Sequence, residues 1–237
     1  MLVYIDIPMT SVSAYNAFSD ALGEDNVAWV GRNITVKDLA KPERLEHYAV
    51  IGGRIEFFRV HDYPLDTIFS TSVGKPIDRV MARWMTEATT SENRFHEDAH
   101  TFTIPELFEK KHPFTRLLSN FATRFLCIDE KEAATADAAL ETIEDYPFLV
   151  GDPAHPRQTA MALSRVLGLA PEALSFTGFM APKVERPRPE VRPVILEKNA
   201  QDEKLYRKLV AMRPANRKFV RSNLPLLGKM AAQSGED

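Results

Sequence analysis

Short apolar runs alternate with amphipathic helical segments along most of this 237-residue chain, and this alternation most constrains its fold. The first run, residues 2–7, is apolar at nearly every position, as a strand buried on both faces of a sheet should be. A helix is expected to follow through Leu22, with Ser13 as its N-cap and Gly23 as its stop. Further short strands are expected at residues 27–30, 48–51, 67–72 and 148–150. The pattern predicts an α/β fold with a central, mainly parallel sheet flanked by helices.

Three more helices are expected before the C-terminal part of the chain. One spans residues 76 to about 87 and begins with Pro76, which suits the first turn because the N–H it lacks would have no partner there. Asp129 is expected to cap a second helix, which runs to residue 143, and a third apolar stripe ends at Gly168.

The C-terminal part differs in composition from the rest of the chain. Residues 181–193 contain four prolines and are expected to form an extended connector, followed by helices at 202–212 and 216–232. We therefore expect an α/β domain over residues 1–180. Residues 181–237 should form the proline-rich connector and basic C-terminal helices that pack on the domain or extend from it.

Charge is distributed unevenly, although the net charge is only −3. Residues 181–237 carry 13 Lys and Arg against 7 Asp and Glu, and residues 204–229 hold eight basic residues and no acidic one. Such a segment can attract phosphate, an anionic lipid surface or an acidic protein, although a solvated helix face is the more ordinary explanation. A second copy of the chain is a further candidate partner, and no nucleic acid is expected.

The sequence also bears on location and redox chemistry. The N-terminus lacks the basic start and apolar stretch of a signal peptide, and no run of 18 apolar residues occurs. We expect a cytoplasmic protein without a transmembrane segment. Cys127 is the single cysteine and lies in an apolar run, so we expect an inert core thiol.

Five segments, taken in order along the chain, match a known pattern. Residues 6–14 (D-I-P-M-T-S-V-S-A) are similar to H-I-P-K-T-G-G-T-S, and residues 50–54 to V-x-x-G-H. Residues 69–79, 120–126 and 148–152 are similar to F-x-x-L-R-D-P-V-D-R, N-x-x-T-R-F-L and V-G-x-T-E. Together they resemble the sulfotransferase family, especially its bacterial and carbohydrate-modifying branch. The resemblance implies a P-loop NTPase-like fold and transfer of a sulfuryl group from 3′-phosphoadenylyl sulfate (PAPS) to a hydroxyl of a carbohydrate or other small acceptor.

The chain departs from this family at most of the positions that the chemistry needs. The resemblance implies a loop lysine at the donor's 5′-phosphate, an arginine and a serine at its 3′-phosphate, and a base for the acceptor proton. The lysine position holds Met9, and the arginine and serine positions hold Gly74 and Ala82. The position of the base holds Arg54, which stays protonated and is a poor base. The two loop glycines are also replaced, by a serine and by the β-branched Val12.

Other side chains are candidates to compensate for these replacements. The candidate donor-binding residues are Thr10, Ser11, Ser13, Lys75 and Arg79, and the candidate bases are His61 and Asp62. A charge-assisted hydrogen bond contributes about 1.5–3 kcal/mol, so the loss of several predicts altered or lost donor binding. Two functions stay open: a sulfotransferase-like enzyme with a modified donor site, and a non-catalytic binding or regulatory protein on the same fold.

A third alternative is a zinc-dependent hydrolase, because residues 96–100 match H-E-x-x-H, with His96 and His100 four residues apart and Glu97 between them. The flanking residues lack the long apolar helix that buries such a site, and Pro105 breaks the segment. We expect a coincidence in a surface loop and no bound metal.

Two further pairs of residues have a functional and a structural interpretation. Arg79 and Arg83 lie one helical turn apart and could hold an anion, but surface ion pairs with Asp78 and Glu87 are the expected role. Two tryptophans, Trp29 and Trp84, could stack on a sugar. Packing against neighbouring apolar residues is the expected role of both.

Overall fold

The structure is a computed structural model that describes residues 1–7, 14–129, 134–151, 153, 155–175 and 187–212. Its centre is a sheet of five strands, β1 (Leu2–Ile5), β2 (Val27–Trp29), β3 (Val50–Gly53), β4 (Ile68–Ser72) and β5 (Phe148–Gly151). The strand order is β2-β3-β1-β4-β5, and every neighbouring pair is parallel. The predicted α/β class with a central parallel sheet flanked by helices is confirmed.

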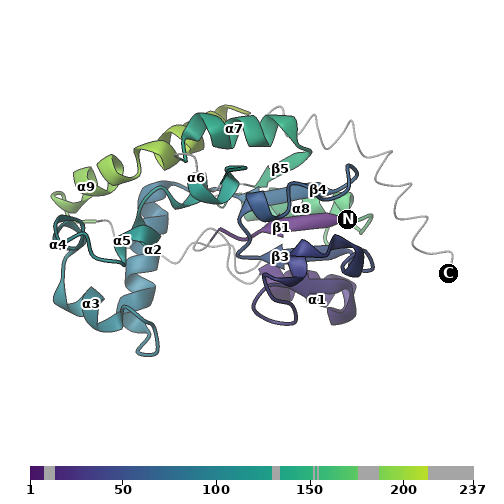
Figure 1. Cartoon of the computed structure of the whole chain (residues 1–237), viewed down its shortest axis with the longest axis horizontal. Helices are drawn as coiled ribbons and strands as arrows, with labels where there is room; N and C mark the ends of the chain where they lie inside the picture. The colour runs from purple at the N-terminus through teal and green to yellow at the C-terminus, as the bar shows by residue number, and fades with distance from the viewer. Residues whose placement is uncertain (8–13, 130–133, 152, 154, 176–186, 213–237) are drawn as a thin grey trace.

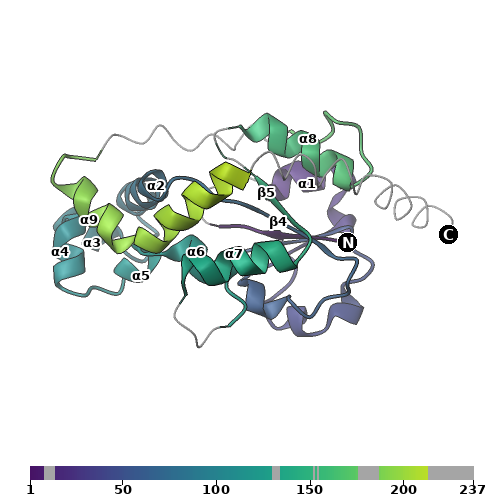
Figure 2. The same cartoon turned by 90° about the horizontal axis from the view of Figure 1, so that it is seen from above.

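Helices cover both faces of this sheet (Figure 1; Figure 2). On one face lie α1 (Ala14–Leu22) and α8 (Pro156–Val166); on the other lie α6 (Phe121–Leu126), α7 (Ala136–Asp145) and a helix over residues 200–212. Successive residues of β1 point to opposite faces, so Leu2 and Tyr4 join the first core while Val3 and Ile5 join the second. Four 3₁₀ turns complete this part: η1 (Glu24–Asn26), η2 (Asp38–Ala40), η3 (Pro42–Arg44) and η4 (Phe57–Arg59).

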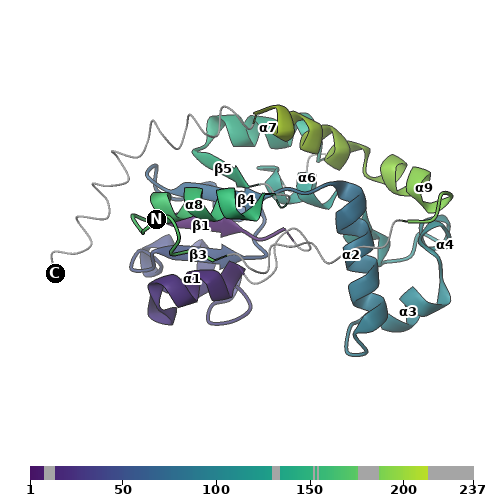
Figure 3. The ribbon, with the colours of Figure 1, turned by 180° about the vertical axis from the view of Figure 1, so that it is seen from behind.

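An all-helical part, which we call the helical lobe, extends beyond the ends of the strands (Figure 1; Figure 3). It comprises α2 (Pro76–Thr89), α3 (His96–Thr101), α4 (Ile104–Glu109), α5 (Thr115–Leu118) and α9 (Val191–Lys198). Its core includes Val80, Leu107, Phe114 and Ile195. No helix in the ranges that the structure describes is long and apolar enough to cross a membrane.

Both tryptophans pack against neighbouring aromatic rings, as expected. Trp29 stacks on Tyr4 with ring centroids 6.1 Å apart, and Trp84 stacks on Phe114 with centroids 6.2 Å apart. Cys127 is buried, as predicted for a core thiol.

Two helix boundaries differ from the prediction, each for a local reason. The helix expected from Asp129 begins only at Ala136, because the hydroxyl of Thr135 accepts the N–H of Ala138 and caps it there. The connector expected to reach Pro193 is also shorter, since α9 begins at Val191. A proline is tolerated in this first turn because its nitrogen needs no intrahelical partner. The helix expected at 202–212 is confirmed, and the one expected at 216–232 lies outside the described residues.

The helices that begin near residues 121 and 200 cap each other across about eighty residues of sequence. The buried carboxylate of Asp202 accepts Thr123 N at 2.8 Å, Thr123 Oγ1 at 2.6 Å and Ala122 N at 3.2 Å, all at the start of α6. In return, Asn120 Oδ1 accepts the N–H groups of Gln201 and Asp202, at 3.1 and 3.3 Å. Each helix start thus receives the acceptors that its first turn lacks within the helix.

Arg79 of α2 connects the helical lobe to these two helix starts. Its Nη2 donates to Asn199 Oδ1 at 3.0 Å, its Nη1 donates to Leu117 O at 2.9 Å, and Asp202 lies 3.6 Å away. Burial lowers the pKa of Arg79 to about 10, with Asp202 opposing the shift, so the guanidinium is charged at neutral pH. We call Arg79, Asn120, Thr123, Asn199 and Asp202 the Arg79–Asp202 network.

Replacing Asp202 by Ala should lower the free energy of unfolding by about 3–5 kcal/mol, because it leaves Arg79 buried without its counter-ion and α6 without its cap. Urea unfolding followed by circular dichroism measures the change. The control is Asp137→Ala, which removes the exposed pair with Lys204 (2.6 Å) and should cost less than about 1 kcal/mol. Equal effects of the two substitutions would contradict the importance of the network.

Gly52 in β3 is required by the ring of Trp29 on the neighbouring strand. A Cβ atom at this position would lie 2.1 Å from the ring, so Gly52→Ala should lower the free energy of unfolding by about 1–3 kcal/mol through overpacking. Thermal unfolding in the wild type and in a Trp29→Leu background tests the cause. A penalty that persists undiminished without the indole would show that something other than this contact needs the glycine.

Candidate functional site

The carboxyl end of the sheet offers the geometry of a ligand site. All five strands are parallel, so their carboxyl ends share one edge, which faces the helical lobe (Figure 1). The connection after β1 leads to β2 on one side, whereas the connection after β4 leads to β5 on the other. In open α/β sheets, ligands bind outside the carboxyl ends of the strands, at the point where the connections change direction. We call this point the reversal. Here the reversal lies between β1 and β4.

Three of the strands are followed by an exposed basic residue at this edge. Arg32 follows β2, Arg54 follows β3 and Lys75 follows β4. None of the three forms an ion pair with a carboxylate in the described part of the chain. These three side chains bring positive charge to an edge at which Asp6, directly after β1, is acidic, and positive charge is what an anion site requires.

Lys75 is the predicted donor-binding residue that the structure places at the reversal. It directly precedes Pro76 at the start of α2, and β4 pairs with β1 so that Thr71 lies opposite Ile5. The other predicted residues of this site, Thr10, Ser11 and Ser13, lie outside the described residues.

Arg32 was not among the predicted site residues. It follows Gly31, just after the expected strand at 27–30, so a search for basic residues after each predicted strand would have found it. The resemblance pointed instead to motifs after β1, β3 and β4, and none of them includes this turn.

Arg79 and Arg83 have different roles from those expected. The guanidinium of Arg79 is 3% exposed and is engaged in the Arg79–Asp202 network, so it is not presented to a ligand at the edge. Its partner is Asp202 and not the exposed Asp78. Arg83 does pair with Glu87, but this carboxylate is fully buried, so the expected surface pair is an interior one. Burial lowers the pKa of Arg83 and Glu87 opposes this, while the positive charge of Arg54 lowers it further.

The candidate bases lie away from Lys75. His61 Nδ1 is 2.8 Å from Phe58 O and its Nε2 is 3.0 Å from the exposed carboxylate of Asp62. The His61 ring lies beside Phe57, which packs on Phe69 and Phe148 near the amino ends of β4 and β5. A catalytic role for His61 or Asp62 stays a prediction, and their position at the amino half of the sheet gives it no support.

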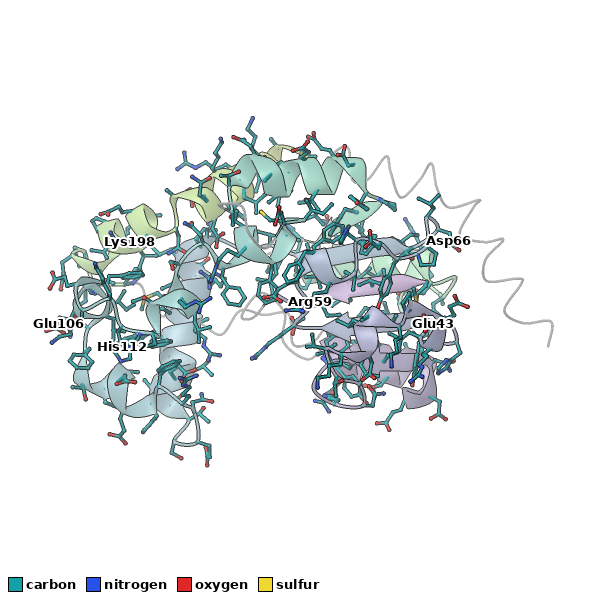
Figure 4. All side chains as sticks on the ribbon, viewed as in Figure 1. Glu43, Arg59, Asp66, Glu106, His112 and Lys198 are labelled. Carbon is teal, nitrogen blue, oxygen red and sulfur yellow. The ribbon has the colours of Figure 1, made fainter. Side chains whose placement is uncertain are left out.

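Arg59 is two residues before His61 in the chain and pairs with Glu56. Figure 4 shows Arg59 between the sheet and the helical lobe, where its Nε donates to Glu56 Oε2 at 2.8 Å. Arg59 is thus already paired with a carboxylate, in contrast to Arg54.

The H-E-x-x-H segment is a helix and not the expected surface loop, and both of its histidines contact backbone carbonyls at the end of α2. His96 Nδ1 lies 3.0 Å from Glu87 O, and His100 Nε2 lies 2.8 Å from Ala88 O. These carbonyls belong to the last turn of α2 and have no partner within the helix, so the two imidazoles cap it. In the residues that the structure describes, no three His, Cys, Asp or Glu side chains are grouped so that they could hold a metal ion.

The comparisons with known proteins do not extend these observations. No protein-family model matches the chain, and no curated protein matches it with significant similarity. The resemblance to sulfotransferases therefore rests on the five segments, and the site rests on the geometry of the sheet edge.

The capping role of the histidines predicts a stability effect without a metal effect. His96→Ala should lower the free energy of unfolding by about 1 kcal/mol, the usual size of a hydrogen-bond contribution. His47→Ala, at an exposed position, is the matched control and should change it by less than about 0.5 kcal/mol. Metal analysis of the purified proteins is the second measurement. One zinc ion per chain, lost in the His96 variant, would overturn the capping assignment.

Proposed function

We propose that this chain binds an anionic ligand of the nucleotide type at the carboxyl edge of its sheet, namely PAPS or its product 3′-phosphoadenosine 5′-phosphate. The observation that carries the proposal is the presence of Arg32 and Arg54 after β2 and β3, on one side of β1, and of Lys75 after β4, on the other side. Phosphate groups are held at such edges by positive charge and by the N–H groups of the following helix. The resemblance to sulfotransferases supplies the identity of the nucleotide.

The reaction that we propose is sulfuryl transfer to a hydroxyl of a carbohydrate or another small acceptor. The acceptor oxygen forms a new bond to sulfur while the bond from sulfur to the phosphate oxygen breaks, and a base receives the hydroxyl proton. Negative charge then develops on the phosphate that leaves with the nucleotide. Lys75 would stabilise this charge from the β4 side of the edge.

Donor binding should nevertheless be weaker than the family pattern implies. The side chains of Gly74 and Ala82 bring no donor to a 3′-phosphate, and Ala82 is buried in α2 of the helical lobe. Arg79, the other candidate for this phosphate, is engaged inside the protein. These replacements support the expectation that donor binding is altered or lost. The proposal also includes the cytoplasmic location expected from the sequence.

A non-catalytic binding or regulatory protein is the second candidate. The observation that favours it is that Arg54, which stays protonated, occupies the position implied for the base. Such a protein would bind the nucleotide at the anion site, or bind a protein partner, without transferring the sulfuryl group.

Titration calorimetry with 3′-phosphoadenosine 5′-phosphate tests the ligand. Lys75→Gln should weaken binding about tenfold, which corresponds to the loss of one charge-assisted contact. Lys198→Gln is the control, because Lys198 lies on α9 in the helical lobe and pairs with Glu197 (Figure 4). Absence of binding at millimolar nucleotide by the folded wild type would exclude the proposed ligand. Transfer or release of labelled sulfate from PAPS then separates the enzyme from the non-catalytic protein.

A further inference from the structure

Arg32 and Arg54 follow the neighbouring strands β2 and β3, on the side of β1 opposite to Lys75. Trp29 of β2 lies opposite Gly52 of β3, and Val30 N donates to Gly52 O at 2.8 Å, so the two strands end together. Neighbouring strands lie about 4.8 Å apart, which brings the turns that carry the two arginines side by side. Lys75 leaves the sheet from β4, on the other side of the central strand.

The guanidinium of Arg32 is placed by a ring contact, and its N–H groups have no hydrogen-bond acceptor among the described residues. Arg32 lies in the turn after β2, and the next residue, Asn33, fixes this turn. Its Oδ1 accepts Trp29 N at 2.7 Å and its Nδ2 donates to Val27 O at 2.8 Å. The guanidinium carbon then lies 4.1 Å from the ring centroid of Tyr15, in the first turn of α1. A stacked guanidinium keeps the N–H groups in its plane available for an oxyanion.

Arg54 is placed by an unusual backbone conformation at the end of β3. Gly53 has φ +127°, and a Cβ on it would lie 3.0 Å from Val30, so only glycine suits this close approach. Burial lowers the pKa of Arg83 in α2, and the positive charge of Arg54 lowers it further. Arg83 has Glu87 as counter-ion, whereas Arg54 has no ion pair with any carboxylate in the described ranges.

We propose that Arg32 and Arg54 form a second oxyanion subsite, which binds a sulfate or phosphate group at the ends of β2 and β3. This inference rests on the proposed function, since the subsite belongs to the same edge. The group it binds is either the phosphosulfate end of the nucleotide, where Met9 replaces the loop lysine, or an anionic substituent of the acceptor. Planar guanidinium groups suit both, because they donate two parallel hydrogen bonds to one oxyanion.

A purely structural role does not account for the pair. A structural arginine such as Arg79 is buried and donates to protein acceptors, whereas Arg32 and Arg54 are exposed. Like charges on neighbouring strands repel each other, so their placement costs stability in the absence of a ligand. Removing either charge should therefore leave the melting temperature of the ligand-free protein unchanged or raise it.

Inorganic pyrophosphate is the probe for the subsite, and the full chain carrying Trp84→Phe gives a local signal. Trp29 is then the one remaining tryptophan, and Tyr15 lies between it and Arg32, with the Tyr15 and Trp29 rings 5.7 Å apart. We expect pyrophosphate to change the Trp29 fluorescence in a saturable manner. Arg32→Gln and Arg54→Gln should each weaken the binding about tenfold.

Arg44→Gln is the matched control, since Arg44 is exposed on η3, next to Glu43 at the far end of the sheet (Figure 4). It should leave pyrophosphate binding unchanged. Equally tight binding by the double variant of Arg32 and Arg54 would overturn the subsite, as would a fall in the melting temperature of the ligand-free single variants together with unchanged binding.

Saturation with 3′-phosphoadenosine 5′-phosphate identifies the source of the bound group. Competition with pyrophosphate assigns the subsite to the nucleotide, and simultaneous binding assigns it to an anionic acceptor. The two proposals fail separately. Pyrophosphate binding that depends on Arg32 and Arg54, without nucleotide binding, would support the subsite and exclude the nucleotide. Nucleotide binding that depends on Lys75, without pyrophosphate binding, would support the nucleotide and exclude the subsite.

Discussion

The buried ion pair between Arg79 and Asp202 is the interaction on which the arrangement of the two parts depends. Both side chains are almost fully buried, and removing two charges from water is costly unless further hydrogen bonds accompany the pairing. The start of α6 supplies them, because its free N–H groups and the positive end of its dipole meet the carboxylate of Asp202. As Arg79 belongs to α2, this network also fixes the helical lobe relative to the sheet edge.

This use of Arg79 changes where an anion site can be. Arg79 was a candidate donor-binding residue from the sequence, but in this chain its hydrogen bonds go to Leu117 and Asn199. In the proposed site, positive charge comes from the basic residues after β2, β3 and β4, which form no ion pair with a carboxylate among the described residues. A motif identifies a residue type at a position, whereas the contacts of that side chain decide whether it faces a ligand or holds the protein together.

The sequence predicted those features that depend on neighbouring residues. Buried strands are short and apolar, and Pro76 marks a helix start, so the sheet and α2 followed from local patterns. The start of α7 did not, because Asp129 and Thr135 are both capable caps and the choice depends on where Ala136 enters the core. The tasks of His96 and His100 depend on carbonyls of another helix, and the partner of Arg79 is 123 residues away in the sequence. No periodicity or motif carries such long-range information.

The distribution of charge at the edge bears on which part of the proposed chemistry this chain retains. Binding an oxyanion requires positive charge, and Arg32, Arg54 and Lys75 provide it from three strands. Proton transfer requires in addition a group that can lose its charge near the operating pH, and a guanidinium at position 54 does not do so. In the proposed site, Arg54 thus stands at the position implied for the base and adds positive charge for an anion. In the proposed site, an arginine in place of the implied histidine favours binding of a sulfated or phosphorylated group over activation of a hydroxyl.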